Sequence, residues 1–131
     1  MIVLLDTTVL IDALRARRDR RGVLAEMVES GHTLATGAIN IGEVYAGVRP
    51  GEEPATEAFL SRLTCYPITA SIARRAGLLK NAWAGKGRTF TLADTMVAAT
   101  ALEHDLPLMT DNRRDFPFPD LALYPSASHR S

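Results

Sequence analysis

The stretch MIVLLDTTVLID, residues 1–12, carries the clearest indication of fold class in this chain of 131 residues. Residues 2–5 are a continuous apolar run with β-branched side chains, which is typical of a strand buried on both faces of a parallel sheet. Asp6 ends the run, and either Thr7 or Thr8 can cap a helix that follows. The stretch therefore predicts a buried strand that passes directly into a helix, with a carboxylate at the junction.

The same alternation of short apolar runs and helical patterns continues along the chain. Parallel neighbouring strands need crossover connections, so this alternation predicts an α/β fold with a central parallel sheet flanked by helices. We expect a single domain over residues 1–125 and a disordered tail over 126–131. The predicted strands cover 2–5, 32–37, 64–68 and 106–110 with a final apolar piece at 121–124, and the predicted helices cover 7–14, 23–28, 39–48, 56–63, 72–83 and 91–103.

The composition excludes several classes of protein. Acidic and basic residues number 15 each, so the net charge is zero and nucleic-acid binding would need a local basic patch. Cys65 is the only cysteine, which excludes an internal disulfide and a cysteine-built zinc site. The apolar run before Asp6 is too short for a signal peptide, and no segment approaches the roughly 18 apolar residues of a membrane span. We therefore expect a cytoplasmic protein that does not enter a membrane.

Acidic residues stand at the edges of four apolar segments. They are Asp6 after the first strand, Glu43, Asp94, and the acids of the segment 111–115. A solitary charge at such an edge is costly to bury unless a cation compensates it. Parallel sheets place ligand sites at the carboxyl ends of their strands, where Asp6 and residues 111–115 are expected. Oxygen ligands without histidine or thiol suit Mg²⁺ or Mn²⁺, so the pattern points to a metal site.

Each acid also has an ordinary structural interpretation. Asp6 and Asp94 can be helix N-terminal acids that the helix dipole favours by about 0.3–1 kcal/mol each. Glu43 can be an ordinary helix glutamate, and residues 111–115 are typical of a turn. Asp12 is expected to pair with a nearby arginine, which leaves it outside the metal site. The combination of all four acidic positions, more than any one of them, favours the metal interpretation.

Four motifs together resemble one known family. They are LLDTTVLID at 4–12, INIGEVYAG at 39–47, TLADTMVAATALEHDLPLMT at 91–110 and TDNRRDF at 110–116. In this order, spread over nearly the whole chain, they resemble PIN-domain ribonucleases, specifically the VapC toxins of bacterial toxin–antitoxin pairs. The resemblance implies a PIN-like fold, Mg²⁺- or Mn²⁺-dependent endonucleolytic hydrolysis of RNA, a homodimer, and inhibition by a VapB-like antitoxin.

The resemblance also implies roles for individual residues. It makes Asp6, Glu43 and Asp94 catalytic, metal-binding carboxylates. The fourth position is Asn112 or Asp115, both ranked above Asp111. Asn112 would offer a neutral oxygen to the metal, whereas Asp115 would add charge and act as a fourth catalytic acid.

Two threonines and two arginines complete the implied site. The hydroxyls of Thr8 and Thr110 would orient the carboxylates, although capping a helix or ending a strand explains either threonine equally well. Arg113 and Arg114 adjoin the acidic motif and are expected to bind the RNA backbone. The basic run of residues 15–21 can serve the same purpose or form a solvated turn.

Two other functional classes compete with the nuclease hypothesis. A catalytically silent PIN-like module that binds RNA or protein would be favoured by an incomplete fourth acidic position. A strand that ends in an aspartate also resembles receiver domains and aspartate-nucleophile phosphatases. The phosphatase pattern needs a second aspartate where this chain has Thr8, and a receiver needs a lysine that LPLMTD lacks.

Overall fold

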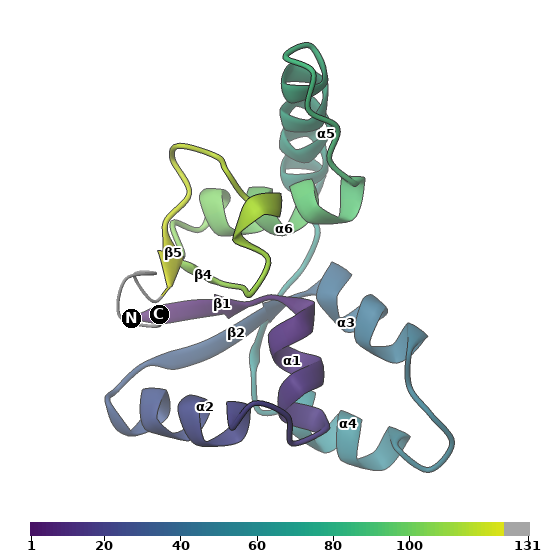
Figure 1. Ribbon diagram of the computed structural model, residues 1–131, viewed down its shortest axis with the longest axis vertical. Coiled ribbons are helices and arrows are strands. Elements are labelled where there is room, and N and C mark those ends of the chain that lie inside the picture. The colour runs from purple at the N-terminus through teal and green to yellow at the C-terminus, as the bar shows by residue number, and fades with distance from the viewer. Residues whose placement is uncertain (125–131) are drawn as a thin grey trace.

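The computed structural model describes residues 1–124 as a five-stranded parallel sheet with the strand order β3-β2-β1-β4-β5, flanked by six α-helices (Figure 1). This confirms the predicted α/β architecture. The predicted tail, 126–131, lies outside the described residues. The strands are β1 Ile2–Leu5, β2 Thr33–Gly37, β3 Thr64–Tyr66, β4 Leu108–Met109 and β5 Leu123–Tyr124. The helices are α1 Thr7–Leu14, α2 Arg20–Glu29, α3 Ala38–Ala46, α4 Glu53–Leu60, α5 Ala70–Ala84 and α6 Leu92–Glu103, with a 3-10 helix η1 at Arg113–Asp115.

Strand β1 lies at the centre of the sheet and is buried on both faces. The side chain of Leu4 packs in the cluster formed with α6, and those of Val3 and Leu5 pack on the opposite face against α1 and α2. All three are completely inaccessible to solvent, and such burial stabilises the fold by about 1.5–3 kcal/mol for each side chain. The continuous apolar run of the sequence therefore reflects helices on both faces, as predicted.

The structure corrects the predicted cap of α1 and the predicted start of α4. The residue that caps α1 is Asp6, because its carboxylate accepts a hydrogen bond from the Thr7 amide at 2.8 Å, so the prediction that a threonine caps this helix is wrong. Helix α4 begins at Glu53 and takes Pro54 into its first turn, where the missing amide hydrogen of proline costs nothing. By contrast, a threonine, Thr91, does cap α6.

The pairing of β1 with β4 determines where the functional residues meet. Leu5 lies opposite Met109 in the parallel register, and the Asp6 amide donates to the Met109 carbonyl at 2.9 Å. Asp6 and Thr110, which directly follow these paired residues, therefore emerge side by side at the carboxyl edge of the sheet. Within residues 1–124, none of the helices has the length and apolar character needed to cross a membrane.

Candidate active site

Asp6 is the most tightly held acid at this edge, with only 5% of its surface exposed. The Thr110 hydroxyl donates to Oδ2 at 2.7 Å, and the Thr7 amide donates to Oδ1 at 2.8 Å. The Asn40 side-chain amide approaches Oδ1 at 3.5 Å. The contact with Thr110 is the one predicted from the sequence. Three neutral donors therefore fix the orientation of the Asp6 carboxylate without neutralising its charge.

A second hydrogen-bond chain ties α3 to the start of α1. The Thr7 hydroxyl donates to Oε1 of Glu43 at 2.5 Å and accepts from the Asn40 side chain at 2.9 Å. Asn40 is fully buried, and its side-chain oxygen accepts from the Gly37 amide at 3.3 Å. A Cβ at Gly37 would lie 3.1 Å from that oxygen, so the glycine permits this close approach. The chain brings Glu43 of α3 to the same edge as Asp6.

Sequence reasoning assigned the wrong threonine and missed Asn40. The Thr8 hydroxyl is buried and has no hydrogen-bond partner among residues 1–124, so the predicted role of Thr8 in orienting the carboxylates is wrong. Consecutive residues of a helix point about 100° apart, and here Thr7 faces α3 while Thr8 turns away. For Asn40, the only signal in the sequence is an amide between two isoleucines on a helix facing the core.

Asp94 and Asp115 complete the group from the other side of the sheet edge. Asp94 is half-buried in the first turn of α6, where its amide donates to the Thr91 hydroxyl at 3.1 Å. Asp115 is exposed at the end of η1. Electrostatic repulsion links Asp6 and Asp94 to each other and to Glu43 and Asp115, and we call these four residues the acidic cluster.

The electrostatics of the acidic cluster show that its members act on one another. Burial raises the pKa of Asp6, and the charges of Glu43 and Asp115 raise it further. The hydrogen bonds from Thr110 and Thr7 lower this pKa but do not cancel the increase. Burial also raises the pKa of Asp94, with additional repulsion from Asp115, Asp6 and Glu43. The four acids therefore lie within one another's fields, and the negative charge of the two more buried ones is under-compensated.

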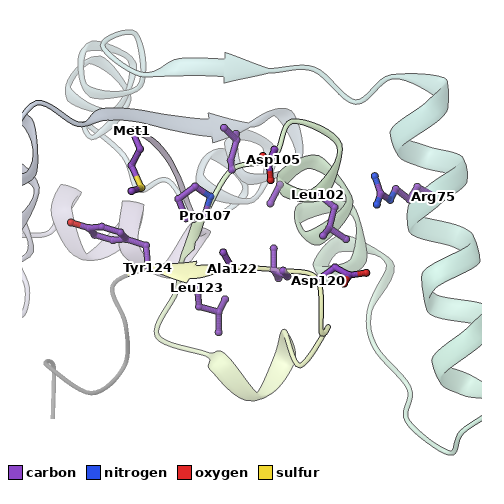
Figure 2. Close-up of a pocket in the computed structure, with 12 residues that line it drawn as sticks. Met1, Arg75, Leu102, Asp105, Pro107, Asp120, Ala122, Leu123 and Tyr124 are labelled. Carbon is purple, nitrogen blue, oxygen red and sulfur yellow. The ribbon is translucent and has the colours of Figure 1, made fainter.

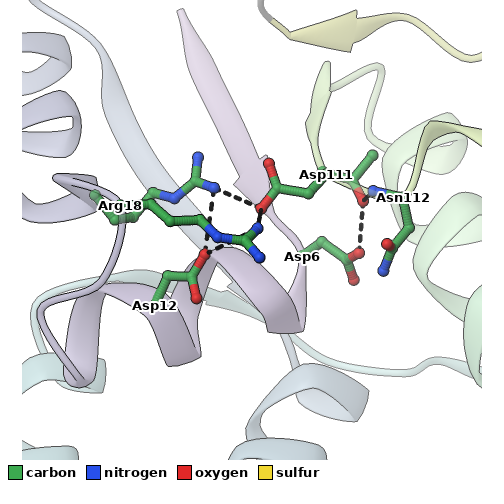
Figure 3. A network of polar contacts seen from close by, with 7 residues as sticks. Asp6, Asp12, Arg18, Asp111 and Asn112 are labelled. Carbon is green, nitrogen blue, oxygen red and sulfur yellow. Dashed lines mark hydrogen bonds and ion pairs between the residues drawn. The ribbon is translucent and has the colours of Figure 1, made fainter.

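Two nearby acids belong to a separate group. Asp12 and Asp111 both bind Arg20, at 3.4 Å and 2.5 Å, and both also contact Arg18, at 3.8 Å and 3.6 Å (Figure 3). The predicted pairing of Asp12 with an arginine is confirmed. We call these four residues the arginine clamp. Because Asp111 is occupied by two guanidinium groups, it is poorly placed to serve as a metal ligand.

Asn112 joins the two groups of acids. Its backbone amide donates to the Thr110 hydroxyl at 3.0 Å, and that hydroxyl in turn donates to Asp6 (Figure 3). The contact that ties Asn112 to Asp6 therefore runs through its backbone and Thr110.

The chemistry of the acidic cluster fits a hard divalent cation. As the side chains stand, no three histidine, cysteine or acidic side chains of residues 1–124 form a ready-made metal-binding group. All the candidate donors are oxygens, which Mg²⁺ and Mn²⁺ prefer, and a cation would compensate the charges of Asp6 and Asp94, whose pKa values are raised by burial and by the neighbouring acids. Glu43 and Asp115 are exposed, so their carboxylates are accessible to an ion held by the other two acids.

A basic hollow of about 320 Å³ opens next to the acidic cluster. Arg88 donates to the Arg114 carbonyl at 2.9 Å, and its guanidinium lies over the Phe90 ring at 4.7 Å. Both contacts fix Arg88 at the wall of the hollow. The lining residues are Arg88, Asp111, Asn112, Arg113, Arg114 and Asp115, which include both arginines expected to bind RNA.

A second cavity, of about 790 Å³, lies at the opposite edge of the sheet (Figure 2). It is lined by Met1, Pro107 and Ala122, which precede β1, β4 and β5 at their amino ends, and by neighbouring residues that include Asp105 and Asp120. None of the acidic cluster lines this cavity. The two edges therefore differ in chemistry, and the candidate site is at the carboxyl edge.

Comparison with known proteins assigns the family. The PIN domain family matches residues 3–122, and the VapC19 ribonuclease of Mycobacterium tuberculosis is 39% identical over 119 residues, which cover 90% of this chain and 95% of the relative. The chain belongs to the VapC family of PIN-domain proteins. The resemblance inferred from the four sequence motifs is thereby confirmed.

Solved structures of other VapC-type proteins agree with this assignment. The VapBC2 structure from Rickettsia felis, bound to a DNA fragment from its promoter, superposes with a TM-score of 0.81 at 25% identity and covers 94% of this chain and 97% of that one. A toxin–antitoxin complex from Klebsiella pneumoniae superposes with a TM-score of 0.75 at 30% identity, covering 92% and 95% of the two chains. The VapC fold thus extends over almost all of this chain.

Proposed function

We propose that this VapC-family chain is an endoribonuclease toxin that requires Mg²⁺ or Mn²⁺ and is neutralised by a VapB-like antitoxin. The observation that carries the proposal is the acidic cluster at the carboxyl edge of the parallel sheet, in which burial, together with the charges of the neighbouring acids, raises the pKa of Asp6 and of Asp94. The ribonuclease relatives support the choice of RNA as the substrate.

Each member of the site would have a distinct task. Asp6 and Asp94 would hold the ion, because they are the more buried acids and those with raised pKa values. A bound divalent ion supplies Lewis acidity toward a phosphate oxygen and lowers the pKa of a water molecule. Glu43 and Asp115 would complete the charge, with Asn112 as a source of a neutral oxygen. Thr110 and Thr7 would keep Asp6 and Glu43 in orientation through the hydrogen bonds described above.

The basic hollow would receive the RNA backbone next to the scissile phosphate. Arg113 and Arg114 would contact phosphates, and Arg88, anchored on Phe90 and on the Arg114 carbonyl, would hold this wall in place. Such contacts give affinity without reading sequence, which in RNA is read mainly on unstacked bases. Single-stranded or loop RNA would therefore fit better than a regular duplex.

An apolar groove would receive the antitoxin. A hollow of about 400 Å³ lies between α1, α2 and α4, and Ala13, Leu24 and Phe59 line it, with Arg21 and Arg62 also contributing. The similar structure from Klebsiella pneumoniae is a toxin–antitoxin complex and that from Rickettsia felis is VapBC2, which supports a VapB-like partner here. The same part of the chain, around 23–28 and 39–63, would also provide the surface for a homodimer.

The main alternative is a catalytically silent PIN-like module that binds RNA or protein. It would be favoured if the fourth acidic position were missing. Asp115 raises the pKa of both Asp6 and Asp94, so its charge is present at the cluster and argues for the active enzyme.

Cleavage of structured RNA tests the proposal. The purified chain should cleave a pool of structured RNAs in Mg²⁺ or Mn²⁺, should stop in excess chelator, and should resume when metal is restored. Asp94→Asn should lower the rate at least about 100-fold, because the loss of a ligand exceeds the usual effect of losing an outer hydrogen bond. Asp120→Asn, at the opposite edge, is the matched control. Cleavage that persists in chelator, or in folded Asp94→Asn protein, would contradict the proposal.

A further inference from the structure

Arg20 is an unusual residue for the middle of a basic run, because only 9% of it is exposed. One of its terminal nitrogens donates to both Asp12 and Asp111, and its Nε is buried with no hydrogen-bond partner among residues 1–124. A buried ion pair gives little net stability, and a buried N–H without a partner is costly. The burial of Arg20 therefore calls for an explanation other than stability.

The backbone before Arg20 carries a second cost. Ala16, Arg18 and Asp19 have φ values of 53°, 56° and 52°, in the left-handed region that non-glycine residues rarely adopt. Such conformations persist where surrounding contacts enforce them, and they are concentrated at functional sites. In this segment the strained turn places Arg18 and Arg20 in contact with Asp111, which is 91 residues away from Arg20 in the sequence.

Asp111 is the point at which this clamp reaches the acidic cluster. It directly precedes Asn112, whose amide donates to the Thr110 hydroxyl, and that hydroxyl donates to Asp6. A continuous line of contacts therefore leads from buried Arg20 to the carboxylate of Asp6. The segment 110–115 also carries Asp115, the exposed member of the acidic cluster.

We propose that Arg20 is a positioning residue for the metal site, which acts by holding Asp111 and thereby fixing the segment 110–115 against Asp6. The inference rests on the proposed metal-dependent function. Arg20 itself touches neither substrate nor metal. It sets the position of Thr110 and Asp115, on which the affinity of the cluster for a divalent ion depends.

Two variants cut the clamp from opposite sides without leaving a buried lone charge. Asp111→Ala removes the contact on the segment, while Arg20 keeps its partner Asp12. Arg20→Met combined with Asp12→Asn removes the buried ion pair on the other side and leaves Asp111, whose side chain is 32% exposed, in contact only with exposed Arg18 and water. Arg15→Met is the matched control, because Arg15 at the end of α1 contacts Glu52 and the Gly47 carbonyl and does not reach residues 110–115.

Two readouts other than activity test the proposal. Titration of metal-free protein with Mn²⁺, followed by electron paramagnetic resonance of the free ion, should show about tenfold weaker binding or worse in both clamp variants. Hydrogen exchange at the Asn112 amide should become faster in both. Combining the two variants should reduce the Mn²⁺ affinity little further, since both break the contact between Arg20 and Asp111. Arg15→Met should behave like the wild type in both measurements.

The outcomes separate this inference from the proposed function. Wild-type Mn²⁺ affinity and Asn112 exchange in either folded clamp variant would overturn the role of Arg20. If Asp111 were itself a ligand, freeing it by Arg20→Met with Asp12→Asn would maintain or strengthen Mn²⁺ binding, which would also overturn the inference. Failure of the wild type to bind Mn²⁺ would instead refute the proposed function, while the exchange measurement would still report on the clamp.

Discussion

The acidic cluster and the arginine clamp place similar residues in opposite electrostatic states at one edge of the sheet. In the clamp, Asp12 and Asp111 are paired with two arginines. In the cluster, Asp6 is held by neutral donors, and its pKa and that of Asp94 are raised by burial and by the neighbouring acids. Compensation of charge, and not the number of acids, therefore distinguishes the proposed metal site from the structural ion-pair network.

The largest expected difference is in the response of metal binding to pH. Protons compete with the metal for the carboxylates of Asp6 and Asp94. Because the pKa values of both carboxyls are raised, this competition begins at a higher pH than for ordinary acids. Apparent Mn²⁺ affinity should fall as pH is lowered through the raised pKa values, by up to about tenfold per pH unit for each proton displaced. Calorimetric titrations at several pH values measure this slope. An affinity that does not change from neutral to mildly acidic pH would contradict the assignment of these two acids as ligands.

A smaller effect should separate the arginines of the two regions. Arg113 and Arg114 line the hollow next to the cluster, whereas the charges of Arg18 and Arg20 are engaged by aspartates. Replacing both Arg113 and Arg114 with glutamine should weaken RNA binding and reduce the salt slope of log K by about 0.7 for each phosphate that the variant no longer neutralises. Filter binding over a series of salt concentrations measures the slope. Replacing exposed Arg74 on α5 with glutamine is the control. An unaltered salt slope in the Arg113/Arg114 variant would argue against binding of RNA by these two arginines.

The smallest effect is on stability, and its sign should differ between the two regions. The folded-state pKa of Asp94 is raised. The contribution of the Asp94 carboxyl to folding stability is therefore fully present below its unfolded-state pKa and is lost as pH rises through its folded-state pKa. At neutral pH the ionised carboxylate therefore destabilises the metal-free protein, and Asp94→Asn should raise its Tm by about a few degrees. Asp111→Asn should lower the Tm, since it weakens the pair with buried Arg20. Thermal denaturation in the presence of chelator measures both Tm shifts. Shifts of the same sign in the two variants would contradict the contrast.

Much of the fold and most of the acidic cluster follow from local sequence patterns. The apolar run before Asp6 predicts a central strand, and the pairing of β1 with β4 then brings Asp6 next to Thr110. Asp94 is identified by its place at the edge of an apolar segment, near the start of a predicted helix. These residues are predictable because strand ends and helix faces fix their positions independently of distant contacts.

The arginine clamp and the hydroxyl contacts could not be predicted in the same way. Arg20 looks like one more charge in a solvated turn, and only the long-range contact with Asp111 explains its burial. Elsewhere in the run, Arg21 donates to the final carbonyls of α1 and Arg15 pairs with Glu52, so the interpretation as a simply solvated turn is wrong for these residues too. Thr7 and Thr8 are chemically identical neighbours, and only the rotation of α1 decides which one meets Glu43.

Titration of metal-free protein with Mn²⁺ shows whether a divalent ion binds where the acids are under-compensated. The wild type should bind Mn²⁺ at one class of site, Asp6→Asn should lose this binding, and Asp120→Asn at the opposite edge should retain it in full. Equal Mn²⁺ binding by the wild type and by folded Asp6→Asn protein would contradict binding of the ion by these acids.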